Sequence, residues 1–266
     1  QWYFNGVAVG GATSSTLTLS SVTPAQAGSY HVVVRGSSGY DTSSTATLQV
    51  QAPTPPVISS ISMAGGMFQL GFQSQVGTDY AIESTPSSQA PTWTVVTSLA
   101  GTGGLLTYSA AATQPVMYWR VRAGTSVYSV NVVAYANCAI SAGFAFVANP
   151  FAAPSYRIGD LFPYVPEGTA FYKWNGTGYD ISSYEFGVWS NPNLTLAPGE
   201  GIEVHAPVAF VNTFIGEALG SLNVSVPAGR SLLGTIAPIT SEAGWSGLPL
   251  ADGDQVDKWN PALGGF

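Results

Sequence analysis

Short strand-like runs, separated by clusters of glycine, serine and proline, fill almost the whole sequence. Clear examples are Thr16–Leu19, His31–Val34 and Phe68–Phe72. A period of two residues places successive side chains on opposite faces of an extended strand. Helical periodicity is nearly absent, and the best candidate for a helical turn is Tyr156–Phe162. The pattern predicts an all-β fold of tandem β-sandwich domains with very little helix.

An internal repeat divides the C-terminal part of the chain, because residues 228–266 match residues 142–179. Ala142–Val147 aligns with Ala228–Leu233 at an offset of 86 residues, and the Lys-Trp-Asn triplets align at an offset of 85. A nearly fixed spacing of this kind is typical of tandem repeats. We expect one complete β repeat domain over residues 136–227 and a truncated second copy over residues 228–266. The chain is then expected to be a piece of a longer protein.

The first 51 residues combine strand-like segments with two aromatic anchors. The segments are Trp2, Leu17–Val22, Ala27–Val34 and Ala46–Val50. Together they resemble the second half of an immunoglobulin-like domain, whose first strands would lie upstream of the chain. The resemblance implies that Trp2 is the core tryptophan and that Tyr30 is the corner tyrosine at the start of strand F. Val32 stands where the second disulfide cysteine usually lies, so that bridge is absent.

Residues 57–135 follow a stiff proline-rich linker at residues 52–56. Their strand-like runs are Phe68–Phe72, Tyr80–Glu83, Trp93–Val96 and Met117–Arg122. They resemble a fibronectin type III module, and resemble more closely a module of secreted proteins of Verrucomicrobia and related bacteria. The resemblance implies a β-sandwich in which Trp93 and the other aromatic side chains pack between two sheets.

Residues 136–227 carry three short motifs that stand out from their surroundings. They are Asn149-Pro150, Trp174-Asn175-Gly176 and Pro198-Gly199-Glu200-Gly201. Similar motifs recur in large surface proteins of Verrucomicrobia/Planctomycetes-type bacteria. The resemblance implies that residues 136–227 belong to such a surface protein, but it implies no particular activity. The Asn-Gly pair within Lys173–Tyr179 also predicts a β-hairpin.

The composition limits the partners and the compartment of the chain. Charged residues make up only 8% of it, and the net charge is −7. Nucleic-acid binding needs basic patches, and anionic lipid also attracts basic residues, so we expect neither nucleic acid nor membrane as partners. No apolar run is long enough for a membrane-spanning helix, and no signal peptide is recognised. The single cysteine, Cys138, excludes an internal disulfide and is predicted to be a buried apolar side chain.

No catalytic constellation can be assembled from the titratable residues. His31 and His205 fall in different predicted domains, so a Ser-His-Asp set or a zinc site has no basis. Glu200 and Glu203 are a weak candidate for a glycosidase pair, because residues three apart on a strand lie on opposite faces. We therefore expect a protein without enzymatic activity.

The densest acidic run contains Asp252, Asp254 and Asp257. Carboxylates at this spacing are a weak candidate for calcium, the one cofactor considered, and the alternative is an acidic turn before a strand. The first copy offers only Glu167–Thr169 at the same place, which favours the turn.

Five aromatic residues of the repeat copies are candidates for stacking on sugars: Trp174, Tyr179, Tyr184, Trp189 and Trp259. Trp174 and Trp259 recur in both copies and are therefore predicted to be core residues. Tyr184 and Trp189 have no second copy to compare and are weak candidates for a glycan-binding site. The Asn-x-Ser/Thr triplets at Asn175, Asn193 and Asn223 would accept glycans only in a host with the machinery.

The sequence favours a structural role: a component of an extracellular bacterial fibre, appendage or surface adhesin at the cell surface. Its partners would be other copies of itself or further domains of the same long chain, and an incomplete immunoglobulin-like sheet could polymerise by sharing strands. The alternative is a set of non-catalytic glycan-binding modules of a secreted polysaccharide-degrading enzyme. A row of exposed aromatic residues on one sheet face would favour that alternative.

Overall fold

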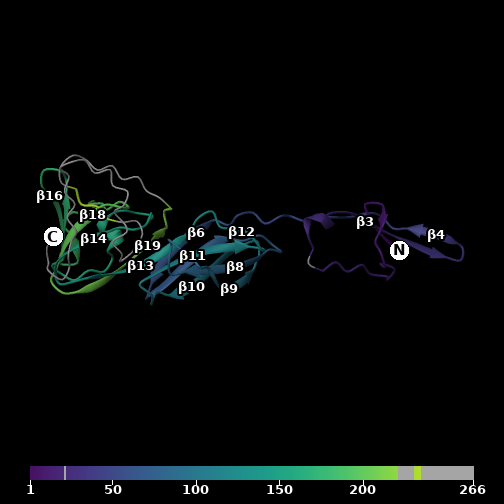
Figure 1. Cartoon of the computed structure of the whole chain (residues 1–266), viewed down its shortest axis with the longest axis horizontal. Coiled ribbons are helices and arrows are strands. Elements are labelled where there is room, and N and C mark those ends of the chain that lie inside the picture. The colour runs from purple at the N-terminus through teal and green to yellow at the C-terminus, as the bar shows by residue number, and fades with distance from the viewer. Residues whose placement is uncertain (21, 221–230, 235–266) are drawn as a thin grey trace. The chain divides into compact units, whose positions relative to one another are not determined.

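A computed structural model describes residues 1–20, 22–220 and 231–234, and its elements are almost all antiparallel strands (Figure 1). The all-β fold class is confirmed. The chain divides into two compact units, Gln1–Thr54 and Pro55–Phe266, and the division falls within the predicted linker. Within the described residues the one α-helix is α1 (Ile158–Leu161), at the predicted helical turn.

The N-terminal unit is an antiparallel sheet in the order β2-β1-β3-β4, with β5 also paired to β3. Its strands are β1 (Trp2–Phe4), β2 (Val7–Ala8), β3 (Gly28–Gly36), β4 (Gly39–Thr42) and β5 (Ala46–Leu48). The expected strand at residues 16–19 does not form. No described segment pairs with it, and alternation without a ladder partner does not hold a strand.

A short 3₁₀ turn, η1 (Pro24–Gln26), leads into β3. The hydroxyl of Tyr30 donates a hydrogen bond of 2.7 Å to the carbonyl oxygen of Gln26, which is the geometry of a tyrosine corner. Trp2 is half-buried in β1, and its indole nitrogen donates to the carbonyl oxygen of Ser14 at 3.0 Å. Both predicted anchors therefore fix chain segments that lie next to the sheet.

The unit that begins at Pro55 opens with two facing sheets. The first sheet has the order β10-β7-β6, and the middle sheet has the order β19-β13-β11-β8-β9 with β12 beside β11. The strands of the first sheet are β6 (Ile58–Ala64), β7 (Met67–Gln73) and β10 (Leu105–Ala111). Those of the middle sheet are β8 (Asp79–Thr85), β9 (Thr94–Ala100), β11 (Val116–Ala123), β12 (Val127–Tyr128), β13 (Val133–Ile140) and β19 (Phe210–Glu217). The two facing sheets enclose one core and form a β-sandwich.

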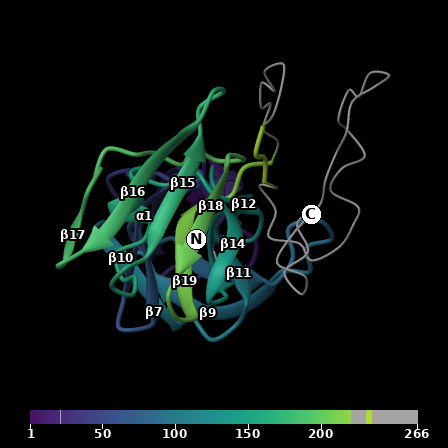
Figure 2. The ribbon, with the colours of Figure 1, turned by 90° about the vertical axis from the view of Figure 1, so that its left-hand side faces the viewer.

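A third sheet follows, in the order β14-β18-β15-β16-β17 (Figure 2). Its strands are β14 (Gly143–Ala148), β15 (Ala170–Trp174), β16 (Tyr179–Glu185), β17 (Val188–Trp189) and β18 (Gly201–Ala206). The predicted hairpin joins β15 to β16. The side-chain oxygen of Asn175 accepts hydrogen bonds from the backbone nitrogens of Thr177 and Gly178, which shapes the loop.

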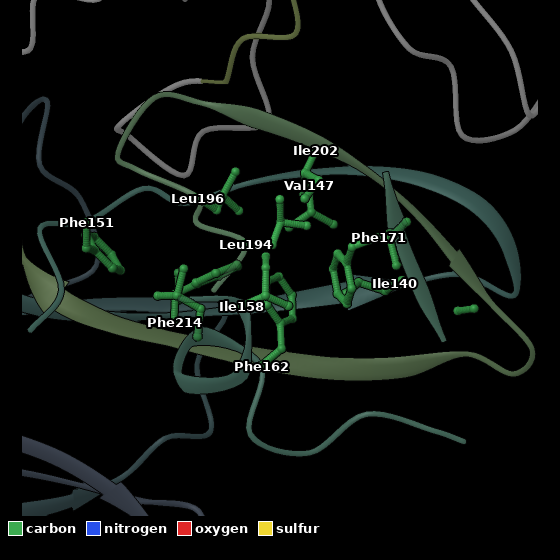
Figure 3. Close-up of a cluster of buried hydrophobic side chains, with 14 of the residues drawn as sticks. Ile140, Val147, Phe151, Ile158, Phe162, Phe171, Leu194, Leu196, Ile202 and Phe214 are labelled. Carbon is green, nitrogen blue, oxygen red and sulfur yellow. The ribbon is translucent and has the colours of Figure 1, made fainter. Parts of the chain in front are cut away.

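The part of the middle sheet formed by β11 and β13 is buried on both faces, because alternate residues of these strands serve two separate cores. The first core lies against the first sheet and takes Trp119, Val121, Val133 and Tyr135 from the middle sheet. The second core lies against the third sheet and takes Tyr118, Ala134, Ala136 and Phe214. Figure 3 shows this second core, where Phe162 contacts both Phe171 and Phe214. The three sheets therefore form three packed layers.

The boundary predicted between residues 135 and 136 falls inside β13. This strand pairs with β11 on one side and, along its full length, with β19 on the other. The predicted domains at residues 57–135 and 136–227 therefore share a strand. Its sequence, Val-Ala-Tyr-Ala-Asn-Cys-Ala-Ile, lacks a polar alternation because both faces are covered.

Several predictions concern residues outside the described part of the chain. They are the second repeat copy apart from residues 231–234, the acidic run Asp252, Asp254 and Asp257, Trp259, and Asn223. In the part that is described, no helix has the length and apolar character needed to cross a membrane.

Candidate functional site

One face of the third sheet carries a set of aromatic and polar side chains, which we call the aromatic face. It consists of Phe144, Tyr172, Tyr179, Ile181, Glu203 and His205. Strand alternation places it there. In β15, Phe171 is fully buried in the second core, so the next residue, Tyr172, points away from that core. In β18 the buried Val204 separates Glu203 from His205 in the same way.

The strand register brings these residues together across four strands. Phe144 lies opposite His205, with ring centroids 4.8 Å apart, and the centroids of Phe144 and Tyr172 are 6.2 Å apart. Glu203 lies opposite Tyr172, and Tyr172 lies opposite Ile181. Phe144 and Ile181 are each about half exposed, at 51% and 50%. The sequence did not group Phe144, Tyr172 and His205, because only the register shows that they are neighbours.

Charge is sparse around the aromatic face. The single lysine or arginine of these five strands is Lys173, on the opposite side of β15 from Tyr172. Its amino group donates to a carboxylate oxygen of Glu200 at 2.8 Å and to the carbonyl oxygen of Thr195 at 2.7 Å. Among the six residues of the aromatic face, Glu203 is the one with a carboxylate. Glu200 and Glu203 lie on different sides of the sheet and do not form a pair.

The predicted sugar-stacking residues Tyr184 and Trp189 contact each other across β16 and β17, with centroids 5.1 Å apart. The Trp189 ring also lies at a tilt to the Phe171 ring, with centroids 5.5 Å apart, and packs against the second core. Trp174, predicted as a core residue, is half-buried and meets Tyr179 edge to face at 5.2 Å. Alternation along β15 puts Trp174 on the same side as Tyr172. Asn175 and Asn193 are both exposed.

A second cluster, which we call the arginine stack, lies on the middle sheet. The guanidinium carbon of Arg120 lies 4.4 Å from the ring centroid of Trp93 and 4.0 Å from that of Tyr128. The Glu83 carboxylate accepts hydrogen bonds from Arg120 at 2.8 Å and from Arg122 at 2.7 Å. Arg120 lies directly opposite Glu83 in the ladder between β8 and β11. The sequence placed Glu83, Trp93 and Arg120 in three separate strand-like runs, and only the tertiary structure shows that they meet.

The buried carboxylate of Glu83 is compensated by two arginines, which leave the arginine stack with one excess positive charge. The Glu83 side chain is only 6% exposed, whereas both arginines are 21% exposed. Burial raises the pKa of Glu83, but hydrogen bonds from Arg122 and Arg120 and their positive charges outweigh it and hold the pKa below its ordinary value. Removing the Glu83 carboxylate would leave both arginines without their anionic partner, and removing the arginines would leave a buried carboxylate unpaired. Because the Glu83 carboxylate already bonds to both arginines, we interpret the arginine stack as a structural element.

The recurring motifs of the repeat domain contact one another inside it. Asn149 is fully buried, its side-chain nitrogen donates to the carbonyl oxygen of Leu196, and its side-chain oxygen accepts from the backbone nitrogen of Phe151. The backbone nitrogen of Gly199 donates to the carbonyl oxygen of Asn149 at 3.1 Å. Gly199 has a φ of +78°, which favours glycine. The Asn-Pro and Pro-Gly-x-Gly motifs therefore hold two loops together.

The remaining reactive side chains are isolated. His31 stacks on Tyr3 with centroids 5.0 Å apart. Cys138 is partly buried beside the second core, and burial raises the pKa of its thiol. Among the described residues, no group of three or more histidine, cysteine, aspartate or glutamate side chains is placed to hold a metal ion. An open hollow beside β6 has one carboxylate, Glu217, and no other titratable group in its lining.

The chain matches no protein-family model and no curated protein sequence. Among solved structures it is similar to the crystal structure of chicken CNTN1 FN1-FN3 domains. The two are 10% identical, with a TM-score of 0.23, over 71% of this chain and 77% of that one. At this TM-score the likeness says nothing about function.

Proposed function

We propose that this chain is a structural segment of an extracellular bacterial fibre, appendage or surface adhesin, without enzymatic activity. The observation that supports it best is the middle sheet, which two sandwiches share through β13 and β19. A shared sheet makes the unit from Pro55 a single cooperative body instead of two beads on a hinge. A rigid, low-charge β body suits a protein that bears load outside the cell.

The partners in this proposal are other copies of the chain or further domains of the same long protein. Electron microscopy of native material, together with the mass of the intact polypeptide, tests the fibre role. Filaments are expected. Isolated particles without polymer would refute the role, and the mass tells whether the repeating subunit is a small chain or a giant modular protein.

Force spectroscopy of the chain between handles tests the mechanical part of the proposal. Residues 55–217 should extend in one step of about 550 Å, at about 3.4 Å per residue, before the folded length is subtracted. Two steps of about half that length would show that the sandwiches unfold independently. The unit from Pro55 would then not be a single rigid body, and the structure would no longer support a load-bearing role.

The second candidate function is glycan binding, and the aromatic face is the observation that favours it. It places aromatic rings and hydrogen-bonding groups side by side on a partly exposed sheet face, away from either core. In this role the chain would supply non-catalytic modules of a secreted polysaccharide-degrading enzyme.

A further inference from the structure

We propose that the aromatic face of the third sheet is a binding site for a single chain of a neutral polysaccharide. The fibre proposal does not depend on this site, because an adhesive fibre and a fibre without ligand would have the same architecture. The site differs from the pair Tyr184 and Trp189, since Trp189 packs against the second core.

The dimensions of the face suit an oligosaccharide. Its residues come from β14, β18, β15 and β16, which are neighbours in that order. Adjacent strands lie about 4.8 Å apart, so the face extends roughly 14 Å across the sheet. A short run of pyranose rings laid across the strands would contact Phe144, Tyr172 and Ile181 in turn.

The chemistry of the face matches the two kinds of surface that a pyranose presents. The faces of aromatic rings carry partial negative charge and attract the polarised C–H groups on the flat side of a sugar. Around them stand the Glu203 carboxylate, the His205 imidazole and the hydroxyls of Tyr172 and Tyr179. A carboxylate forms strong charge-assisted hydrogen bonds with hydroxyl groups at a ring's edge.

Charge disfavours two other kinds of partner, an apolar protein surface and a polyanion. An apolar protein surface would cover the half-buried Glu203 without giving its carboxylate a hydrogen-bond donor, which is costly. A polyanion would meet a carboxylate, no arginine or lysine on this face, and a chain of net charge −7. A neutral polymer of hydroxyl groups avoids both penalties.

The tilt of the rings selects a single chain over a flat crystalline surface. Phe144 is inclined by 51° to Tyr172 and by 56° to His205, and Tyr172 is at 89° to Tyr179. A crystalline polysaccharide would need coplanar rings, whereas a flexible chain can adjust each sugar to each ring.

The test is affinity electrophoresis of the 266-residue chain in gels that contain laminarin, xyloglucan or galactomannan, with alginate as the anionic probe. Retardation is expected with at least one neutral polymer and not with alginate. Tyr172→Ala should weaken binding at least about fivefold, the loss of one aromatic contact. Tyr164→Ala is the matched control, because Tyr164 is 86% exposed and lies outside the face.

A second variant, Glu203→Gln, keeps the shape of the side chain and removes its charge. It should weaken binding severalfold while leaving the thermal unfolding midpoint unchanged, so loss of fold is separated from loss of the site. The proposal is overturned if no neutral polymer retards the chain or if Tyr164→Ala weakens binding as much as Tyr172→Ala. It is also overturned if Tyr172→Ala abolishes self-association in sedimentation instead of sugar binding, since the face would then join copies of the chain. None of these results changes the outcome of the filament test.

Discussion

The N-terminal sheet and the middle sheet are built from the same kind of antiparallel ladder, but they bury very different amounts of side chain. In the N-terminal unit Tyr30 is the one buried apolar residue among those described, at 7% exposure. In the middle sheet, Val133 to Ala136 are all buried, because one core covers each face. Backbone hydrogen bonds are common to both sheets, so we expect the difference in buried apolar surface to set their relative stability.

The comparison shows that the burial of a strand depends more on its place in the layers than on its own sequence. β3 contains three consecutive valines and remains half-exposed, whereas β13 contains three alanines and is buried from Val133 to Ala136 and at Ile140. We expect the N-terminal unit to open at a lower free energy than the unit from Pro55. The following predictions test this contrast, from the largest effect to the smallest.

Phe214→Ala should destabilise the unit from Pro55 by about 3–5 kcal/mol, because Phe214 is 2% exposed and packs against Phe162 in the second core. Val211→Ala on the same strand is the control, at 61% exposure, and should change stability by less than about 0.5 kcal/mol. Denaturant unfolding gives both values.

Phe214→Ala also tests whether the middle sheet couples the two cores. Hydrogen exchange should accelerate in β7, across the first core, together with β19. Exchange that accelerates in β19 alone would show that the two sandwiches are independent.

Glu83→Gln should destabilise the unit from Pro55 by about 3 kcal/mol, because two partly buried arginines lose their shared carboxylate. Glu185→Gln is the matched control on an exposed glutamate. Thermal and denaturant unfolding of the three chains provide the comparison. A loss no larger than that of the control would show that the arginine stack contributes little.

Acid should weaken the unit from Pro55 through Glu83. The folded pKa of this carboxyl lies below its ordinary value of 4.5, so its contribution is complete above about pH 4.5 and is lost as the pH falls through the folded pKa. Denaturant midpoints measured from pH 7 downward should fall more steeply in the natural chain than in Glu83→Gln. Parallel curves would assign the acid sensitivity to other carboxylates.

Tyr30→Phe should cost about 1 kcal/mol in the N-terminal unit by removing the hydrogen bond to Gln26. Hydrogen exchange should rise in β3 and stay unchanged in β13, since the two lie in separate units. Tyr40→Phe, at a residue that is 76% exposed, should have no measurable effect. An equal rise in both variants would mean that the corner hydrogen bond adds no stability.

Cys138 should react slowly with thiol reagents at neutral pH, because burial raises the pKa of its thiol and the thiolate is the reactive form. Labelling followed by mass spectrometry should become fast only in denaturant that unfolds the middle sheet. Rapid labelling of the native chain would show that this edge of the second core opens readily.

The sequence determined the fold class, the position of the linker and the local turns. Alternating residues in β7 and β15, the Asn-Gly hairpin and the helical turn at Ile158–Leu161 are local features, which depend on neighbours along the chain. The tyrosine corner is local as well, since the hydrogen bond from Tyr30 reaches back only four residues.

Tertiary structure alone decided which strands share a sheet and which face of each strand is covered. The pattern of β15 cannot say whether Phe171 or Tyr172 faces a core, and the sequence therefore missed the aromatic face. The strand expected at residues 16–19 does not form because no described segment pairs with it. No domain boundary lies at residue 135, because β13 pairs with strands on both sides. Periodicity records a strand's two faces, but pairing and burial depend on segments far away in the chain, such as Arg120 and Glu83.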